Sequence, residues 1–157
     1  MSKKEKNNWT NWHHLVHKAI IKDARFIPNG IKLLIAVSGG QDSMALLTLF
    51  RDIKDYHDWE IYVWHGDHQW HSKSSIYAKE LKSFCNFKKI KFYSDKAEYI
   101  EVSTEEKARN WRYQKLHDTA KKLVEPNKGI DDIYILTGHT SSDNAETFLL
   151  NLARGSS

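Results

Sequence analysis

Short apolar runs alternate with segments of helical length along this sequence, and this alternation is its strongest constraint on a fold. The apolar runs cover residues 31–37, 60–65, 89–94 and 132–138. Apolar residues recur at helical spacing in residues 11–26, 42–54, 72–87, 103–124 and 142–155. Strands separated by helices favour right-handed crossovers within one parallel sheet. The sequence therefore predicts an α/β fold, with a doubly wound parallel sheet of Rossmann-like type.

Local signals mark the ends of two of these helices. Ser103 and Glu106 have the spacing of a capping box, in which each side chain satisfies a free backbone N–H, so the helix 103–124 is expected to begin at this pair. Gly155 is suited to end the last helix.

Length and composition indicate one hydrophobic core. The chain has 157 residues, of which 40% are hydrophobic, which suits one domain of ordinary size. We assign residues 1–30 to a polar tail and a helix, and residues 31–157 to the domain. The sequence contains no run of about 18 apolar residues, so no membrane span is expected. The N-terminus lacks the apolar segment of a secretory signal, so a cytoplasmic location is expected.

Charge and cysteine content narrow the chemistry only slightly. Cys85 is the only cysteine, which excludes an internal disulfide and a cysteine-based metal site. The net charge of +4 is compatible with an anionic partner but does not require one. Lysines interleaved with aromatic residues in 79–96 could follow a nucleic-acid backbone. A solvated surface with inward-facing aromatic residues is the simpler interpretation.

Histidines occur in two groups. The group on the first expected helix is interpreted as a polar face and consists of His13, His14 and His17. The group at the end of the second expected strand has the spacing of a metal site but no partner carboxylate, and consists of His65, His68 and His71. We do not favour the metal site.

The segment SGGQDS, residues 38–43, follows the first apolar run and opens a helix. Serine hydroxyls and glycine amides at a helix N-terminus form an anion cradle. The lysine of a Walker loop and the glycine pattern of a dinucleotide fingerprint are both missing, which favours pyrophosphate as a leaving group over transfer of a γ-phosphoryl group. Asp42 predicts a Mg²⁺ ion between carboxylate and phosphate. The alternative is a helix-capping turn with Ser38 or Asp42 as the cap.

The stretch AVSGGQDSMALL resembles the PP-loop of the N-type ATP pyrophosphatases, which cleave ATP between the α and β phosphates. Residues 104–116 and 137–157 resemble segments that characterise the tRNA(Ile)-lysidine synthetases. The resemblance implies the PP-loop ATPase fold and a ligase that adenylates the wobble cytidine of an isoleucine tRNA with a CAU anticodon. Free L-lysine then displaces AMP. ATP, Mg²⁺, this tRNA and L-lysine are the implied ligands, and a homodimer is the implied assembly.

The resemblance also implies roles for single residues. ATP phosphates and Mg²⁺ would be bound by Ser38, Gly39, Gly40, Gln41, Asp42 and Ser43, with Asp42 as the metal ligand. His139, Asp143 and Glu146 match the family pattern H-x-x-x-D-x-x-E. His139 and Asp143 would act in catalysis with Asp42. Asp143 and Glu146 would share a helix face and bind the lysine ammonium group.

Arg109 and Arg112 lie one helical turn apart and could hold phosphate or adenylate between planar guanidinium groups. The alternative is that both form surface ion pairs. We expect both to contact substrate.

The sequence departs from the family at two places. Ser142 stands where many members have a first aspartate, and the chain ends at Ser157, where the family continues. We therefore expect a truncated catalytic domain. Two other hypotheses stay open: another PP-loop tRNA-modifying enzyme, although thiolases of this group generally need cysteine clusters, and an inactive module that binds ATP or tRNA.

Overall fold

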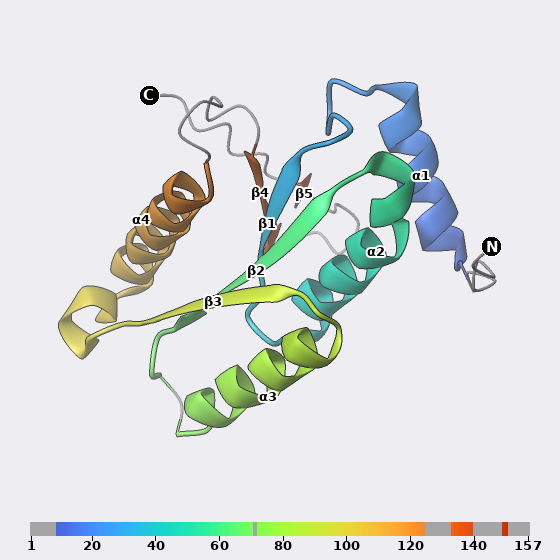
Figure 1. Cartoon of the computed structure of the whole chain (residues 1–157). Coiled ribbons are helices and arrows are strands. Elements are labelled where there is room, and N and C mark those ends of the chain that lie inside the picture. The colour runs from blue at the N-terminus through green and yellow to red at the C-terminus, as the bar shows by residue number, and fades with distance from the viewer. Residues whose placement is uncertain (1–8, 71, 125–132, 140–148, 151–157) are drawn as a thin grey trace.

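The computed structural model describes residues 9–70, 72–124, 133–139 and 149–150 (Figure 1). In chain order its elements are α1 Asn11–Lys22, β1 Lys32–Ala36, α2 Gln41–His57, β2 Glu60–Asp67, α3 Ser74–Phe87, β3 Lys91–Lys96, the 3-10 helix η1 Tyr99–Val102, α4 Glu105–Leu123, β4 Ile133–His139 and β5 Leu149–Leu150. No helix within these ranges is long and apolar enough to cross a bilayer.

The strands form one sheet in the order β3-β2-β1-β4-β5. β1 pairs in parallel with both β2 and β4, and β2 pairs in parallel with β3. The chain therefore moves outward from β1 through β2 to β3 and then returns to the other side of β1. This order confirms the predicted parallel α/β sheet.

The segment predicted as a fifth helix contains a strand instead. Leu149–Leu150 form β5, which pairs antiparallel with Gly138 and His139 of β4. Two adjacent leucines suit either a helix or a short strand, so apolar spacing alone could not distinguish the two. The rest of the segment 142–155 lies outside the described residues.

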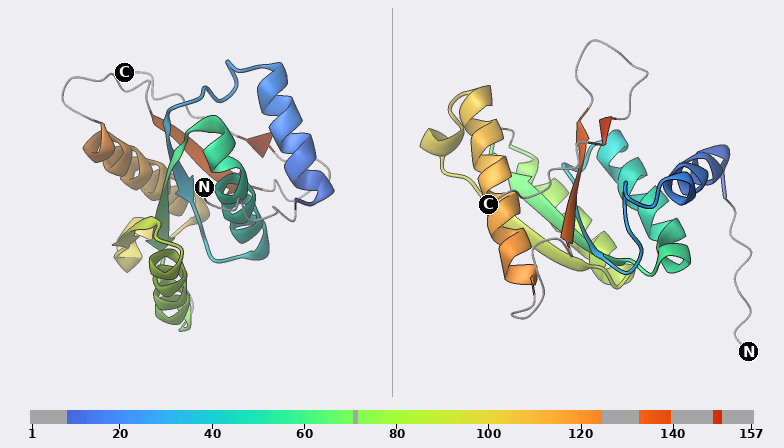
Figure 2. Two further views of the ribbon diagram at one scale, coloured as in Figure 1. Left: turned by 45° about the vertical axis from the view of Figure 1, so that its right-hand side comes forward. Right: turned by 90° about the horizontal axis from the view of Figure 1, so that it is seen from above.

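Helices cover both faces of the sheet (Figure 2). On one face, α2 and α3 pack with inward residues of the strands, and α1 packs against α2; Leu33, Ile35 and Val63 belong to this core. On the other face, α4 and η1 pack against residues such as Leu34 and Trp64. Neighbouring strand residues thus enter different cores, which explains why the strands are apolar along their length.

The start of α4 differs from the expected capping box. Thr104 is the N-cap, and its Oγ1 accepts a hydrogen bond from the Lys107 N–H at 3.2 Å. Ser103 Oγ instead donates to the Ile100 carbonyl of η1 at 3.4 Å. Two adjacent hydroxyl residues could serve as the cap, and the preceding turn of η1 engages the first of them.

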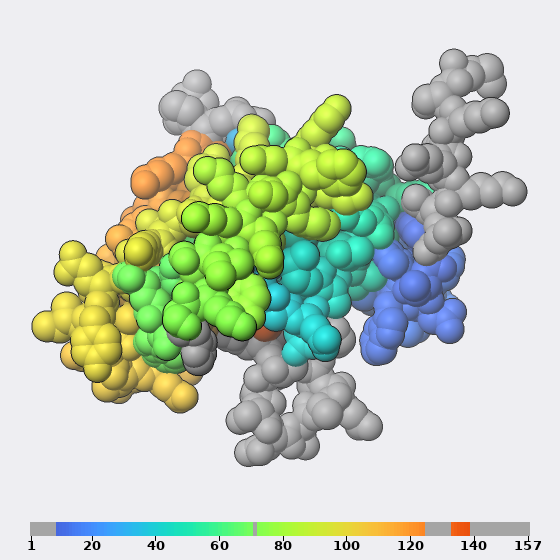
Figure 3. Space-filling view, turned by 90° about the horizontal axis from the view of Figure 1, so that it is seen from below, coloured from blue at the N-terminus to red at the C-terminus, as the bar shows by residue number. Residues whose placement is uncertain are grey.

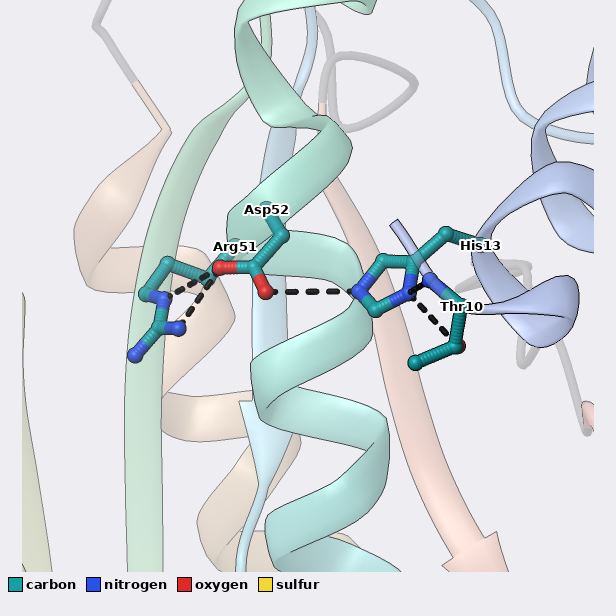
Figure 4. A network of polar contacts seen from close by, with 4 residues as sticks. All are labelled: Thr10, His13, Arg51 and Asp52. Carbon is teal, nitrogen blue, oxygen red and sulfur yellow. Dashed lines mark hydrogen bonds and ion pairs between the residues drawn. The ribbon is translucent and has the colours of Figure 1, made fainter. Parts of the chain in front are cut away.

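The interpretation of the α1 histidines as a polar face is wrong for His13. Its side chain is buried, and Nε2 lies 3.3 Å from Oδ2 of Asp52 on α2 (Figure 4). Nδ1 accepts a hydrogen bond from the Thr10 N–H at 3.0 Å. Arg51 donates to the other Asp52 oxygen at 2.6 Å and 2.8 Å. His13 therefore links the first turn of α1 to the middle of α2.

Candidate functional site

A pocket of about 190 Å³ opens at the carboxyl ends of β1, β2 and β4. Its walls also include the first turn of α2 and one residue of α4. Polar side chains in the lining are Ser38, Ser43, His68, Arg112 and Thr137. The pocket lies where the order of the strands reverses beside β1, the place where parallel sheets of this kind bind ligands. Figure 3 views the molecule from this end, with the start of α2 beside α3.

The loop between β1 and α2 is fastened by the buried hydroxyl of Ser43. Ser43 Oγ donates to the Gly40 carbonyl at 3.0 Å and accepts from the Ser38 N–H at 3.2 Å. Its distance to Ser38 Oγ is 3.1 Å, and the Gly40 N–H donates to Ser38 Oγ at 3.3 Å. Gly39 has a φ of +91°, which favours glycine. The loop conformation is thus set by hydrogen bonds within residues 38–43.

The N-terminus of α2 has no side-chain cap among the described residues. Gly40 is its N-cap, so the alternative in which Ser38 or Asp42 is the cap is wrong. The first amides of a 17-residue helix carry partial positive charge directed at the loop. The side chains of Gln41 and Asp42 in the first turn are exposed. Phosphate could therefore approach the amides while Asp42 stays accessible to a cation.

Only one of the two arginines lines the pocket among the described residues. Arg112 is half-buried, and its Nη2 lies 3.3 Å from Nε2 of His68. Burial lowers the pKa of Arg112 below its usual value. Arg109 is exposed, and its guanidinium lies over the ring of Tyr113 at 5.7 Å. The expected substrate contact of Arg109 stays a prediction.

His65 has a structural position. Its ring is buried, and Nδ1 lies 2.7 Å from the carbonyl oxygen of Val37, to which it can donate. This contact joins β2 to the residue that precedes the loop. Within the described ranges, no three His, Cys, Asp or Glu side chains are placed to hold a metal ion. His71, the third histidine of the disfavoured metal site, lies outside those ranges.

Several residues of the pocket were not anticipated. Trp64 forms part of the wall and donates from Nε1 to Asp95 Oδ2 at 2.7 Å. A Cβ added to Gly66 would lie 2.5 Å from Trp64 Cη2 and 2.9 Å from Trp111 Cζ3. Thr137 Oγ1 is buried and has no hydrogen-bond partner among the described residues. Each lies near the carboxyl end of a strand, and that position is the signal that could have identified it.

Three further candidates cannot be placed in the pocket. His139 is the last residue of β4, where it pairs with Leu149, but its side chain is not among those described. Asp143 and Glu146 lie outside the described residues. Gly138, the residue before His139, lines the pocket.

Cys85 and the lysine-rich segment are not part of the pocket. Cys85 is buried on α3, and burial raises its thiol pKa to about 11, so it is an unreactive core residue. The lysines of α3 and β3 are exposed, as either interpretation of this segment requires, but Phe87 is 78% exposed, so the expectation that the aromatic residues all face inward is wrong for Phe87.

Comparisons with known proteins agree with this geometry. Residues 11–157 match the family model described as the PP-loop domain. The chain is 62% identical over 149 residues to a tRNA(Ile)-lysidine synthase of Prochlorococcus marinus subsp. pastoris, a match that covers 95% of this chain and 44% of the relative.

A second strain of Prochlorococcus marinus has a protein of the same name that is 46% identical, over 98% of this chain and 46% of the relative. A Nostoc protein with that name is 38% identical, over 94% of this chain and 40% of the relative. The chain thus spans less than half the length of these curated relatives. Because the family model matches nearly all of the chain, the protein belongs to the PP-loop domain family.

Proposed function

We propose that this chain binds ATP in the strand-end pocket and serves as the ATP-activating part of a tRNA(Ile)-lysidine synthase. The observation that carries the proposal is the loop of residues 38–40, which Ser43 holds against the N-terminus of α2 beside the pocket, where no described side chain caps the helix. The names of the relatives supply the reaction class, and the PP-loop family supplies the nucleotide.

The loop and α4 would hold the phosphates from two sides. Backbone amides at Gly39 and Gln41 are suited to phosphate oxygens, and the hydrogen bonds among Ser38, Gly40 and Ser43 hold the loop that presents them. Arg112 would approach from the opposite wall, where its planar guanidinium can donate two hydrogen bonds to one phosphate. Neutralisation of the pyrophosphate from both sides would favour its departure.

Mg²⁺ fits the site through Asp42. Mg²⁺ keeps several water ligands and commonly binds proteins through one or two carboxylates together with substrate phosphates. The exposed Asp42 carboxylate in the first turn of α2 is therefore sufficient on the protein side. The positive charge of the Mg²⁺ ion would also offset the negative charge of the phosphates and help to orient them for cleavage.

The proposed reaction has two steps. The C2 oxygen of the wobble cytidine attacks the α-phosphorus of ATP, a P–O bond forms, and pyrophosphate leaves. The ε-amine of L-lysine then attacks C2, a C–N bond forms, and AMP leaves with the former C2 oxygen. Asp143 and Glu146 are proposed to bind the ammonium form of this amine, which must lose a proton to solvent before it attacks, and His139 is proposed to assist catalysis. A homodimer and a cytoplasmic location complete the proposal.

Incorporation of labelled lysine tests the ligase. The protein in its full natural length is mixed with ATP, Mg²⁺, labelled L-lysine and an isoleucine tRNA with a CAU anticodon; a methionine tRNA with the same anticodon is the control. Label should enter only the isoleucine tRNA and only with ATP. ATP binding without any incorporation would contradict the ligase and support the binding-module hypothesis.

Pyrophosphate release tests the loop separately. Asp42→Ala should lower ATP-dependent pyrophosphate release by roughly 100-fold, because a ligand of the phosphate-bound cation is lost. Cys85→Ala, a change in the core away from the pocket, should lower it by less than about 2-fold. Equal effects of the two substitutions would show that the loop has only a structural role.

A further inference from the structure

Unpaired polar atoms gather around the pocket. Among the described residues, buried side-chain atoms without a hydrogen-bond partner include His68 Nδ1, Trp111 Nε1 and Thr137 Oγ1. His68 and Thr137 line the pocket, and the ring of Trp111 packs edge-on against His68 at 5.2 Å. Buried polar atoms are rarely left unpaired in folded proteins, so a cluster of them marks a place built for further contacts.

The contact between His68 and Arg112 defines the state of the imidazole. The guanidinium has only N–H donors, so His68 Nε2 accepts from Arg112 Nη2 across their 3.3 Å separation. Nε2 can accept only if it carries no proton. The neutral ring therefore has its proton on Nδ1, and its accepting edge faces Arg112.

The surroundings of His68 favour this neutral form. The charged and titratable groups that face it are Arg112 of α4 and His65 and Asp67 of β2, while Trp70 and Trp111 pack against the ring. Burial lowers the pKa of His68 first, the positive charge of Arg112 and the neighbouring His65 lower it further, and Asp67 opposes them. The imidazole thus stays neutral at neutral pH.

We propose that His68 is a positioning residue that acts through Arg112: its imidazole helps to hold the guanidinium at the wall of the pocket that would take a phosphate-bearing ligand. An arginine side chain has many rotamers, and a ligand that had to order them would bind more weakly. Fixing one N–H on His68 removes part of this cost before the ligand arrives. This role of His68 rests on the proposed ATP site, to which His68 would contribute through Arg112.

The test is a double-substitution cycle on ATP affinity, measured by calorimetry with Mg²⁺ at neutral pH. The variants are His68→Leu, which removes the acceptor, His68→Gln, whose amide oxygen can replace it, Arg112→Ala, and the pair His68→Leu with Arg112→Ala. His14→Gln, on the exposed side of α1, is the matched control. Thermal melting of each variant shows whether it is folded.

His68→Leu should weaken ATP binding by roughly 10-fold, and His68→Gln should restore it to within about 3-fold of the wild type. In the Arg112→Ala background, His68→Leu should change the affinity by less than about 2-fold, because the residue that it positions is gone. His14→Gln should bind as the wild type does.

Two results would overturn the role of His68 alone. One is equal weakening by His68→Leu and His68→Gln, and the other is a full His68→Leu effect in the absence of Arg112; either would mean that the ring acts by packing. Failure of the folded wild type to bind ATP would instead overturn the proposed ATP site and, with it, this role.

Discussion

His17 of α1 and His57 at the end of α2 share a hydrogen bond, with Nδ1 of His17 2.9 Å from Nε2 of His57. Nδ1 of His57 lies 2.9 Å from Oδ1 of Asn29, and its ring stacks on Trp59 with centroids 4.3 Å apart. Since the Asn29 oxygen accepts, His57 Nδ1 carries the proton and Nε2 accepts from His17. His17 is therefore a link between helices and not part of a free polar face.

The His17–His57 link predicts weaker folding in mild acid. Burial, and secondarily His17, lowers the pKa of His57 below its ordinary value of 6.5. The unfolded chain then takes up a proton at a higher pH than the folded chain, so the free energy of unfolding falls as the pH drops through and below about 6.5. Urea denaturation at about pH 7.5 and about pH 5.5 measures this loss.

Histidine substitutions identify the group responsible. His57→Gln should lose less stability between the two pH values than the wild type does, whereas His14→Gln should keep the wild-type loss. An unchanged loss in His57→Gln would assign the pH dependence to other groups, such as His68.

Removal of the Asp52 carboxylate should loosen α1. Asp52→Ala leaves the buried His13 Nε2 without its partner on α2, at an expected cost of about 1–3 kcal/mol in the free energy of unfolding. Asp55→Ala, on the same helix, removes only an exposed ion pair with Lys54 and should cost less than about 0.5 kcal/mol. Chemical denaturation of both variants gives the comparison; similar costs would mean that the His13 contact contributes little.

Steric space distinguishes two glycines at the pocket. Gly66→Ala should destabilise the protein by about 1–3 kcal/mol, because the new methyl group would collide with Trp64 and Trp111. Gly138→Ala should cost less than about 1 kcal/mol, since the nearest atom to its Cβ is Ser43 Cα at an ordinary 3.6 Å. Thermal unfolding followed by circular dichroism tests this order, and a larger loss for Gly138→Ala would contradict the expected packing.

Ser43 should matter for both stability and ligand binding. Ser43→Ala leaves the Ser38 N–H without its acceptor, which should cost about 1–2 kcal/mol of stability and weaken ATP binding roughly 10-fold. Ser83→Ala, at an exposed position of α3, is the control and should alter neither quantity measurably. Unchanged ATP binding by a folded Ser43→Ala variant would mean that the loop keeps its shape without this hydroxyl.

The parallel sheet was predictable because its strands are buried on both sides. Leu33, Leu34 and Ile35 are all fully buried. An uninterrupted apolar run between helices suits few structures other than a strand that is covered on both faces. Helix starts were less predictable, since Ser103 and Thr104 are chemically equivalent caps and only the packing of η1 distinguishes them. The buried position of His13 is not predictable from the sequence, because its partner, Asp52, is distant along the chain and comes close only through tertiary packing.

The loop of the candidate site was predictable from the sequence, but the residues of the pocket walls were predictable only in part. Residues 38–43 carry a local pattern that identifies them without a structure. Arg112 and Arg109 have the same chemistry one turn apart, and only the orientation of α4 places the first at the pocket and leaves the second exposed. The neutral state of His68 depends on neighbours from two elements, which no local pattern records.

The hydrogen bonds of Ser43 also bear on the speed of ligand capture. Because a residue of α2 fastens the loop that precedes it, residues 38–40 lose their conformational entropy when the helix docks on the sheet. At the proposed phosphate site, an incoming anion would meet amides that are already aimed, and its association would not wait for the loop to rearrange. The loop conformation that the proposed phosphate site requires is thus already formed when the chain has folded.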